Sequence, residues 1–255
     1  MLSHGLAVIS GSLVGFILAL IGGGGSILAT PLMLYVVGMK DPHLAIGTGA
    51  LAVSVNAFIN LAHHARVGNV RWKIGAVFAA TGVGGAYVGS TVGKLVDGQN
   101  LLLAFAGLMI GVALLMLRTQ NQISDQMSVP SLRRTLGVGG TGLGVGMLAG
   151  FFGIGGGFLI VPGLVMATRM KLIHAIGTSL LAVGAFGFTT AANYALSGLV
   201  DWVVAIEYIA GGLVGGQIGL RLAVHLAERK NTLNQVFAGV ILAVAAYMFW
   251  RGLSR

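Results

Sequence analysis

Two clusters of glycine interrupt otherwise apolar stretches of the chain. Their members are Gly22, Gly23, Gly24, Gly25, Gly153, Gly155, Gly156 and Gly157. Consecutive glycines can fold into a concave nest of backbone N–H donors that binds an anion, and the lack of Cβ lets a ligand approach the backbone closely. We therefore predict that both clusters, with the adjacent Ser26, bind a substrate. The alternative is that they only allow a tight hairpin to pack against its neighbours.

Further polar side chains lie inside apolar segments. They are Thr48, Asn56, Asn60, Thr178, Ser179 and Asn193. Amide N–H groups can donate to sulfonate or carboxylate oxygens, and a polar group at membrane depth is costly unless it meets a partner or water. We predict that these residues also contact the substrate. For the threonines the competing interpretation is a hydrogen bond between helices or to the preceding turn.

Three titratable residues are candidates for proton coupling. Glu207 is the acid expected within a membrane span, about 9 Å along its helix from Asp201, and an intramembrane carboxyl is a functional candidate by default. His63 and His64 lie near the end of another apolar segment. They could relay protons or simply lie at the membrane interface.

The chain has few residues of the types and spacing that catalysis requires. The chain has no cysteine, which excludes disulfides and thiolate metal sites. An enzyme built on His63, His64 and His174 would lack an HExxH motif and a plausible acid partner. We predict no catalytic residues, no metal and no cofactor.

The elements that position these residues are membrane helices. Of 255 residues, 56% are hydrophobic and 8% charged, and the mean hydropathy is +0.93; a soluble domain is about a quarter charged. The apolar runs lack the period-two alternation of a membrane barrel. The first run lacks a basic flank and a clear cleavage site, so we read it as a retained helix rather than a signal peptide. The net charge of +9 fits basic loops on one side of a bilayer and does not require nucleic acid.

An internal repeat organises the chain. The stretch "ALIGGGGSILATPLM" (19–33) aligns with "GFFGIGGGFLIVPGL" (150–164), and "IGTGALAV" (46–53) aligns with "IGTSLLAV" (176–183). The offset stays near 130 residues, so the sequence divides into a first membrane repeat (1–117), a polar linker (118–134) and a second membrane repeat (135–255).

Each repeat contains five apolar segments, and the second one in each repeat is short. The segments are 5–21, 26–38, 44–63, 72–94 and 99–117, then 135–152, 157–168, 173–196, 202–223 and 232–250. Thirteen residues span about 20 Å as a helix, less than the hydrocarbon core of about 30 Å. The short segments are therefore either half-helices of a hairpin or continuations of a broken span.

Basic residues favour an odd number of crossings per repeat. With all five segments reversing direction, the loops at 64–73, 118–134, 169–172 and 221–231 share one side and carry eleven of the fifteen Lys and Arg residues. By the positive-inside rule that side is cytoplasmic, which predicts two inverted repeats. The predicted fold is an all-α polytopic membrane protein of two inverted repeats with about five helical segments each.

The motifs themselves resemble a known family. "GSLVGFILALIGGGGSILATPLM" (11–33) and "GMLAGFFGIGGGFLIVPGL" (146–164), each followed by "IGT", resemble the sulfite exporter TauE/SafE (TSUP) family over nearly the whole chain. Ile154 interrupts the second glycine run. The resemblance implies an integral membrane transporter of sulfur-containing anions such as sulfite, sulfoacetate and related sulfonates.

Residues and resemblance together predict a secondary transporter. Inverted repeats with interrupted helices point to such proteins. We expect alternating access, a small anionic substrate, possible coupling to protons, and a location in the bacterial cytoplasmic membrane. A passive anion channel is the alternative. The sequence leaves the oligomeric state and the transport direction open.

Overall fold

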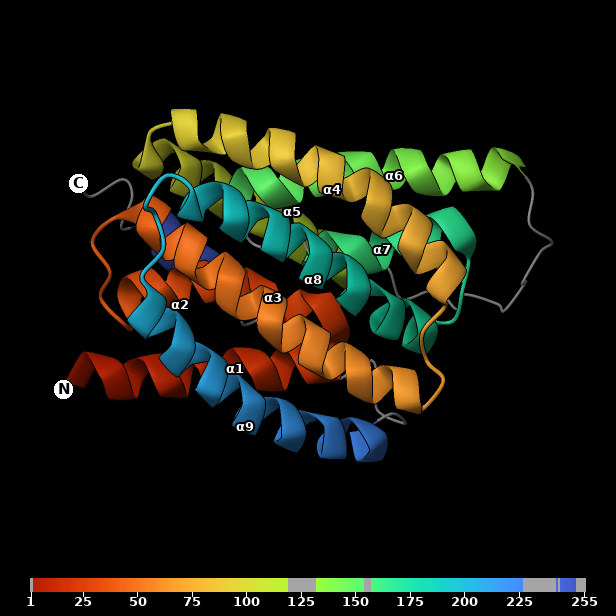
Figure 1. The fold of residues 1–255 in the computed structure, drawn as a ribbon, viewed down its shortest axis with the longest axis horizontal. Helices are drawn as coiled ribbons and strands as arrows, with labels where there is room; N and C mark the ends of the chain where they lie inside the picture. The colour runs from red at the N-terminus through yellow and green to blue at the C-terminus, as the bar shows by residue number, and fades with distance from the viewer. Residues whose placement is uncertain (1, 119–131, 154–156, 227–241, 243, 251–255) are drawn as a thin grey trace.

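A computed structural model describes residues 2–118, 132–153, 157–226, 242 and 244–250, and these residues form helices joined by short loops (Figure 1). The elements are α1 (Leu2–Ile21), the 3₁₀ helix η1 (Gly22–Leu28), α2 (Ala29–Tyr35), α3 (Pro42–Arg66), α4 (Trp72–Leu95), α5 (Gly98–Arg118), α6 (Leu132–Phe152), α7 (Gly157–Thr168), α8 (Leu172–Ala195) and α9 (Trp202–Leu226). The prediction of an all-α membrane protein is confirmed within this part of the chain. Most of the linker and of segment 232–250 lies outside it.

Five helices of the described part are long and apolar enough to cross a bilayer. They cover Pro42–Arg66, Trp72–Leu95, Thr135–Phe152, Ile173–Ala195 and Trp202–Arg221. Tryptophans at the first position of α4 and of α9 are exposed, as expected for aromatic side chains at a membrane interface. The protein is therefore an integral membrane protein.

Helices α3 and α8 form the centre and run in opposite directions (Figure 1). The hydroxyl of Ser54 in α3 donates a 2.7 Å hydrogen bond to the carbonyl oxygen of Gly184 in α8. Gly47, nearer the start of α3, approaches Tyr194 near the end of α8. Contacts that move forward along one helix and backward along the other define an antiparallel pair.

Two outer pairs of helices flank this centre, α1 with α9 and α4 with α6 (Figure 1). Small residues bring their backbones together: a Cβ on Gly15 would overlap the backbone of Gly212, and one on Gly146 would overlap that of Gly82. Close approach at glycines spaced by four is the usual device for packing membrane helices. Each outer pair joins one helix of the first half to one of the second.

The contacts of one half recur in the other at a spacing of 130 or 131 residues. The Thr48 hydroxyl accepts from the Asp201 backbone N–H at 2.9 Å, and the Thr178 hydroxyl accepts from the Arg71 N–H at the same distance. Positive φ angles also recur in pairs: Gly22 with Gly153, Gly38 with Arg169, and Gly68 with Gly198. Equivalent helices such as α1 and α6 run in opposite directions in Figure 1. Their orientation across a bilayer stays a prediction.

Acidic residues in the described ranges mostly cap helices. The carboxylate of Asp41 accepts from the backbone N–H groups of His43 and Leu44 at the start of α3. Asp97 does the same at the start of α5, and Asp201 at the start of α9. A carboxylate there accepts from otherwise unpaired N–H groups and interacts favourably with the helix dipole. Glu207 is the described acid left without such a role.

Candidate functional site

The first glycine cluster turns the chain back on itself. Helix α1 ends at Ile21, and Gly22 follows with φ +72°, a conformation that residues with a Cβ rarely adopt. A Cβ on Gly25 would overlap the backbone of Ile17 and Leu18, so η1 returns along the end of α1. Of the two interpretations of the short segment, the structure has the hairpin, and the glycines make its close packing possible.

The second cluster begins with the same turn. Gly153 has φ +66° directly after α6, and α7 starts at Gly157. The predicted site residues Gly155 and Gly156 lie outside the described residues. Gly153 and Gly157 are both buried.

The two clusters meet inside the protein. The backbone N–H of Gly157 donates to the Ser26 hydroxyl oxygen at 3.3 Å. A Cβ on Gly22 would lie 2.9 Å from Ile176 Cγ2 and 3.0 Å from Ser179 Oγ of α8, and one on Gly153 would overlap the side chain of Ile46 in α3. Each cluster therefore packs against the central helix of the other half. Gly22, Gly24, Gly25 and Ser26 are buried, and Gly23 continues the same 3₁₀ helix.

The predicted hydroxyl residues make protein contacts beside this meeting point. Thr48 and Thr178 are fully buried and accept from the backbone N–H groups of Asp201 and Arg71, the residues just before α9 and α4. The Ser179 hydroxyl donates to the Ile176 carbonyl oxygen at 2.7 Å. The threonines therefore hydrogen-bond to the starts of neighbouring helices, and their contact with a substrate stays a prediction.

The predicted residues Asn56, Asn60 and His64 lie on one face of α3 and are almost fully buried. The Asn60 amide donates to the Asn56 carbonyl oxygen at 2.9 Å. Asn60 Oδ1, both amide atoms of Asn56 and both ring nitrogens of His64 have no hydrogen-bond partner. His63 is half-buried and its Nδ1 also lacks a partner. These atoms are buried with unused hydrogen-bonding capacity.

Asn193 lies apart from this face, in a network between α8 and α4. Its amide nitrogen donates to the hydroxyls of Ser90 and Thr91 at 2.7 and 3.0 Å. Its two oxygen atoms accept from Lys94 Nζ at 2.8 and 3.0 Å, and Lys94 also donates to Ser197. The amide that we expected to face a substrate has protein partners here. The ammonium of Lys94 therefore donates its hydrogen bonds to uncharged acceptors.

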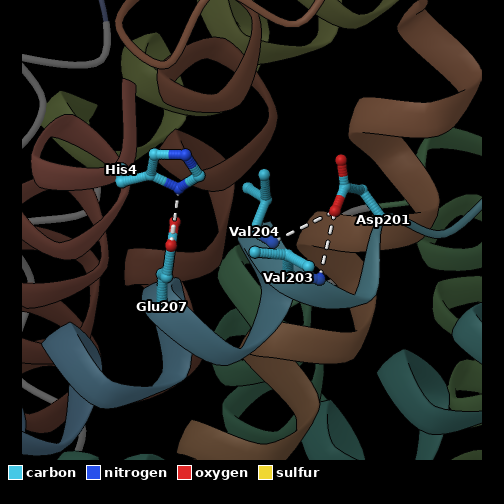
Figure 2. Close-up of polar contacts among 5 residues, drawn as sticks. All are labelled: His4, Asp201, Val203, Val204 and Glu207. Atoms are coloured by element: carbon cyan, nitrogen blue, oxygen red, sulfur yellow. Dashed lines mark hydrogen bonds and ion pairs between the residues drawn. The ribbon is translucent and has the colours of Figure 1, made fainter. Parts of the chain in front are cut away.

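Glu207 is paired rather than isolated. Its Oε1 lies 2.6 Å from Nδ1 of His4 in α1, with the two side chains 23% and 54% exposed. Figure 2 shows this pair, and it shows the Asp201 carboxylate turned toward the backbone N–H groups of Val203 and Val204 instead. Glu207 Oε2 is buried without a partner. The pair lies near the start of α9, about 7 Å along the helix from Trp202.

Arg71 is a candidate that the sequence analysis overlooked. Its Nη2 lies 3.0 Å from Nε2 of His174, and His174 Nδ1 lies 3.3 Å from the Asn69 carbonyl oxygen. An Nδ1–H donating to Asn69 leaves Nε2 to accept from Arg71. This holds the guanidinium beside the start of α8, close to the segment that Gly22 contacts. The signal was present, because the equivalent of "NVRWK" in the second half is the acidic "LVDWV".

Metal-binding geometry is absent from the described residues, where no group of three or more His, Asp or Glu side chains is placed to hold an ion. The chemistry that remains is that of backbone N–H groups, amides and a few cations. Such a set of donors suits an anion.

Comparison with known proteins places this architecture among transporters. The chain matches the family model described as Sulfite exporter TauE/SafE over residues 7–248. A probable membrane transporter protein of Xylella fastidiosa (strain Temecula1) is 54% identical over 95% of this chain and 93% of its own length. YunE of Bacillus subtilis, also described as a probable membrane transporter protein, is 24% identical over 99% of both chains. MJ0441 of Methanocaldococcus jannaschii is 29% identical over 78% of this chain and 72% of its own. No solved structure matches.

Proposed function

The chain belongs to the sulfite exporter TauE/SafE family, and from that premise we propose that this membrane transporter carries small sulfur-containing anions by alternating access. The proposed substrates are sulfite, sulfonates such as sulfoacetate, and related oxyanions. The proposed location is the bacterial cytoplasmic membrane. The 54% identical Xylella protein, itself described only as a probable membrane transporter protein, agrees with transport and leaves the substrate to experiment.

One observation carries the choice of an anion. The two glycine clusters meet through Ser26 and Gly157, where irregular backbone is buried between helices. In a membrane such backbone persists where protein packs around it or where it lines a wet cavity. The N–H groups at the start of α7 and along η1 are donors, and a helix N-terminus favours negative charge.

The reciprocal contacts support alternating access. Two halves that share the same local structure can exchange conformations, because the contacts made by one half are available to the other. Inverted repeats around a central site are the common arrangement for this motion. In the proposed orientation the loop at 64–73 faces the cytoplasm, and the loop between α8 and α9 faces the opposite side.

Proton coupling is proposed through Glu207. Three of the four described acids cap helices, whereas Glu207 presents a buried oxygen without a partner beside His4. A carboxyl that binds and releases a proton during transport would link anion flux to a proton gradient. The imidazole of His4 would then sense the same cycle.

Reconstitution into liposomes tests the proposal. Purified protein is first screened by thermal shift against sulfite, thiosulfate, taurine, sulfoacetate, sulfate and carboxylate controls. The stabilising anion is then used in a counterflow assay with radiolabelled substrate. We expect saturable uptake that is accelerated by unlabelled anion on the opposite side. Flux that never saturates and shows no counterflow would identify a channel, and the absence of any anion-dependent shift or flux would overturn the proposal.

A further inference from the structure

Helix α3 carries a stripe of buried polar residues that lack partners. Asn56, Asn60 and His64 follow one another at intervals of four residues, so they lie one above another along about 12 Å of helix. They are 1%, 1% and 4% exposed. Five of their side-chain nitrogen and oxygen atoms have no hydrogen-bond partner in the described protein, although the Ala19 backbone lies beside the His64 ring. We call these three residues the α3 polar stripe.

Glycines of α9 make room for the stripe. A Cβ on Gly212 would overlap the Asn56 amide, and one on Gly216 would lie 3.2 Å from Asn60 Oδ1. The amides therefore fill the space that α9 leaves open, and they do so without bonding to it. Each polar group left bare in an apolar interior costs about 1–3 kcal/mol or more. A stripe of such groups is explained more simply by water or solute beside it than by dry packing.

The equivalent stripe in the second half has a different chemistry. The residues 130 positions later are Phe186, Thr190 and Tyr194. The hydroxyls of Thr190 and Tyr194 also lack a partner, so the difference lies in Phe186. The ring of Phe186 stacks on Phe78 with centroids 6.1 Å apart, and it occupies the space beside Gly82. Two aromatic rings thus close the position at which the first half has an amide.

The counterpart of Phe78 in the second half is also polar. Tyr208 lies 130 residues after Phe78, is fully buried, and has a hydroxyl without a partner. Each phenyl ring of the Phe78–Phe186 pair therefore has a counterpart with a hydrogen-bonding side chain, Asn56 in α3 and Tyr208 in α9. The difference between the α4–α8 pair and the equivalent α9–α3 pair therefore involves both positions.

The ends of the two stripes differ in charge. Beyond His64, its own carbonyl oxygen accepts from the Asn69 N–H at 3.0 Å, and Asn69 leads through His174 to the guanidinium of Arg71. The residue equivalent to Arg71 is Asp201, a carboxylate. Arg71 attracts an anion to the first end. The second stripe ends at Tyr194, where Lys94 Nζ lies 5.9 Å from the ring centroid, so that end combines a cation with the Asp201 carboxylate.

We propose that the α3 polar stripe lines a water-filled passage through which the transported anion reaches the glycine clusters from the side of the α3 C-terminus, while the Phe78–Phe186 pair closes the equivalent route from the other side. This deepens the proposed function and rests on it for the identity of the solute. Water and the anion use the same passage. The amides and the imidazole replace part of the hydration of the anion, and the aromatic pair must separate before the anion can leave.

Cysteine labelling tests the passage directly, because the natural chain contains no cysteine. The variants Asn60→Cys and His64→Cys are paired with Thr190→Cys and Tyr194→Cys at the equivalent positions. Each is reconstituted and treated with an anionic, membrane-impermeant thiosulfonate. Accessible thiols react faster than buried ones, so we expect rates at least about tenfold higher at 60 and 64 than at 190 and 194. The reagent must act from the side on which Arg66 lies, and sulfoacetate, which does not cleave disulfides as sulfite does, must slow the reaction.

A second pair of variants keeps the test valid if a cysteine variant folds poorly. Asn60→Leu keeps the branched shape and the number of heavy atoms but removes the polar atoms, and Thr190→Val is its matched control. In a dry interface Asn60→Leu would leave transport unchanged and raise the melting temperature. In a water-filled passage we expect transport to fall by about tenfold or more while the protein stays folded, because an apolar side chain no longer replaces hydration. Thr190→Val should keep its transport.

The outcomes separate the passage from the proposed function. Equal labelling at positions 60 and 190, or no labelling at 60 and 64 in protein that binds an anion, overturns the passage and leaves the transporter intact. If the unmodified protein shows no anion-dependent thermal shift or flux, the proposed function fails, and the ratio of labelling at 60 and 190 still decides whether water enters along α3.

Discussion

The hydroxyl of Ser26 accepts a hydrogen bond from the backbone N–H of Gly157 at 3.3 Å, although the two residues stand 131 positions apart. They are also equivalent positions of the internal repeat. Two equivalent positions that touch each other must lie close to the axis that relates the halves. The backbone N–H at the start of α7 therefore has a protein acceptor on that axis. In the proposed function, an anion bound there would replace the Ser26 hydroxyl as the acceptor.

The substitution Ser26→Ala probes this exchange. It leaves a buried N–H without its acceptor, so we expect a loss of about 1 kcal/mol of stability and a lower melting temperature. A bound anion supplies the missing acceptor, so a saturating substrate should raise the melting temperature by more in the variant than in the natural protein. Differential scanning fluorimetry in detergent measures both shifts. Thr81→Ala is the control, because the Thr81 hydroxyl bonds to carbonyl groups of its own helix. Identical ligand shifts in all three proteins would contradict a role for the Gly157 N–H in binding.

The turn at Gly22 can be tested against a turn elsewhere. Gly22→Ala places a Cβ in the left-handed region, at about 1–2 kcal/mol, and also forces it against Ile176 and Ser179. Gly38 has φ +86° but open space around it, so Gly38→Ala carries the conformational cost alone. We expect a clearly lower melting temperature and weaker anion binding for Gly22→Ala, and only a modest thermal effect for Gly38→Ala. Equal effects would show that packing at the glycine cluster contributes nothing.

The outer helix pairs provide a matched test of glycine packing. A Cβ on Gly85 of α4 would overlap the backbone of Leu143 in α6, whereas one on the neighbouring Gly84 meets nothing within 4 Å. We expect Gly85→Leu to cost about 3 kcal/mol through overpacking and to reduce the yield of monodisperse protein in size-exclusion chromatography. Gly84→Leu should behave like the natural protein. Comparable yields for both variants would mean that α4 and α6 separate without consequence.

Much of the fold could be predicted because the length of an apolar segment indicates whether it forms a membrane helix. The predicted segment 157–168 coincides with α7, and 99–117 differs from α5 by one residue at each end. The helix break at Gly22 followed from the poor helix propensity of glycine. Length alone did not predict the direction of the short segment, because thirteen residues fit either a hairpin or a broken span. The distribution of basic residues between the loops was needed as well.

The candidate site was harder to predict because residue type does not reveal a partner. Thr48 and Asn193, predicted to contact a substrate, bond to the residue before α9 and to α4. Their contact with a substrate stays a prediction. Glu207 was expected inside a span, but its partner His4 lies about two hundred residues away and has no sequence signal. Arg71 was counted as a topological charge. Only the packing of α4 against α8 brings it beside His174.

The ion pair between His4 and Glu207 gives two variants with different expectations. Because both side chains are partly exposed, the pair contributes less than about 1 kcal/mol to stability, so neither Glu207→Gln nor His4→Gln should change the melting temperature much. If Glu207 is the group that couples protons, Glu207→Gln abolishes the dependence of transport on the proton gradient. His4→Gln keeps the carboxyl and therefore keeps that dependence. Uptake into proteoliposomes with and without an imposed pH gradient distinguishes them, and an unaltered response in Glu207→Gln would exclude this residue as the coupling group.

The inverted arrangement can be tested at two equivalent, exposed positions. Arg66 follows the α3 polar stripe, and Leu196 stands 130 residues later, just after α8. Because α3 and α8 run in opposite directions, these two helix ends must lie on opposite faces of the bilayer. In the cysteine-free chain we expect Arg66→Cys to react with an impermeant maleimide only in inverted vesicles, and Leu196→Cys only in intact cells. The basic loops determine which face is cytoplasmic, so reaction of both variants from the same side would overturn the inverted topology, and with it the two-sided approach of the glycine clusters.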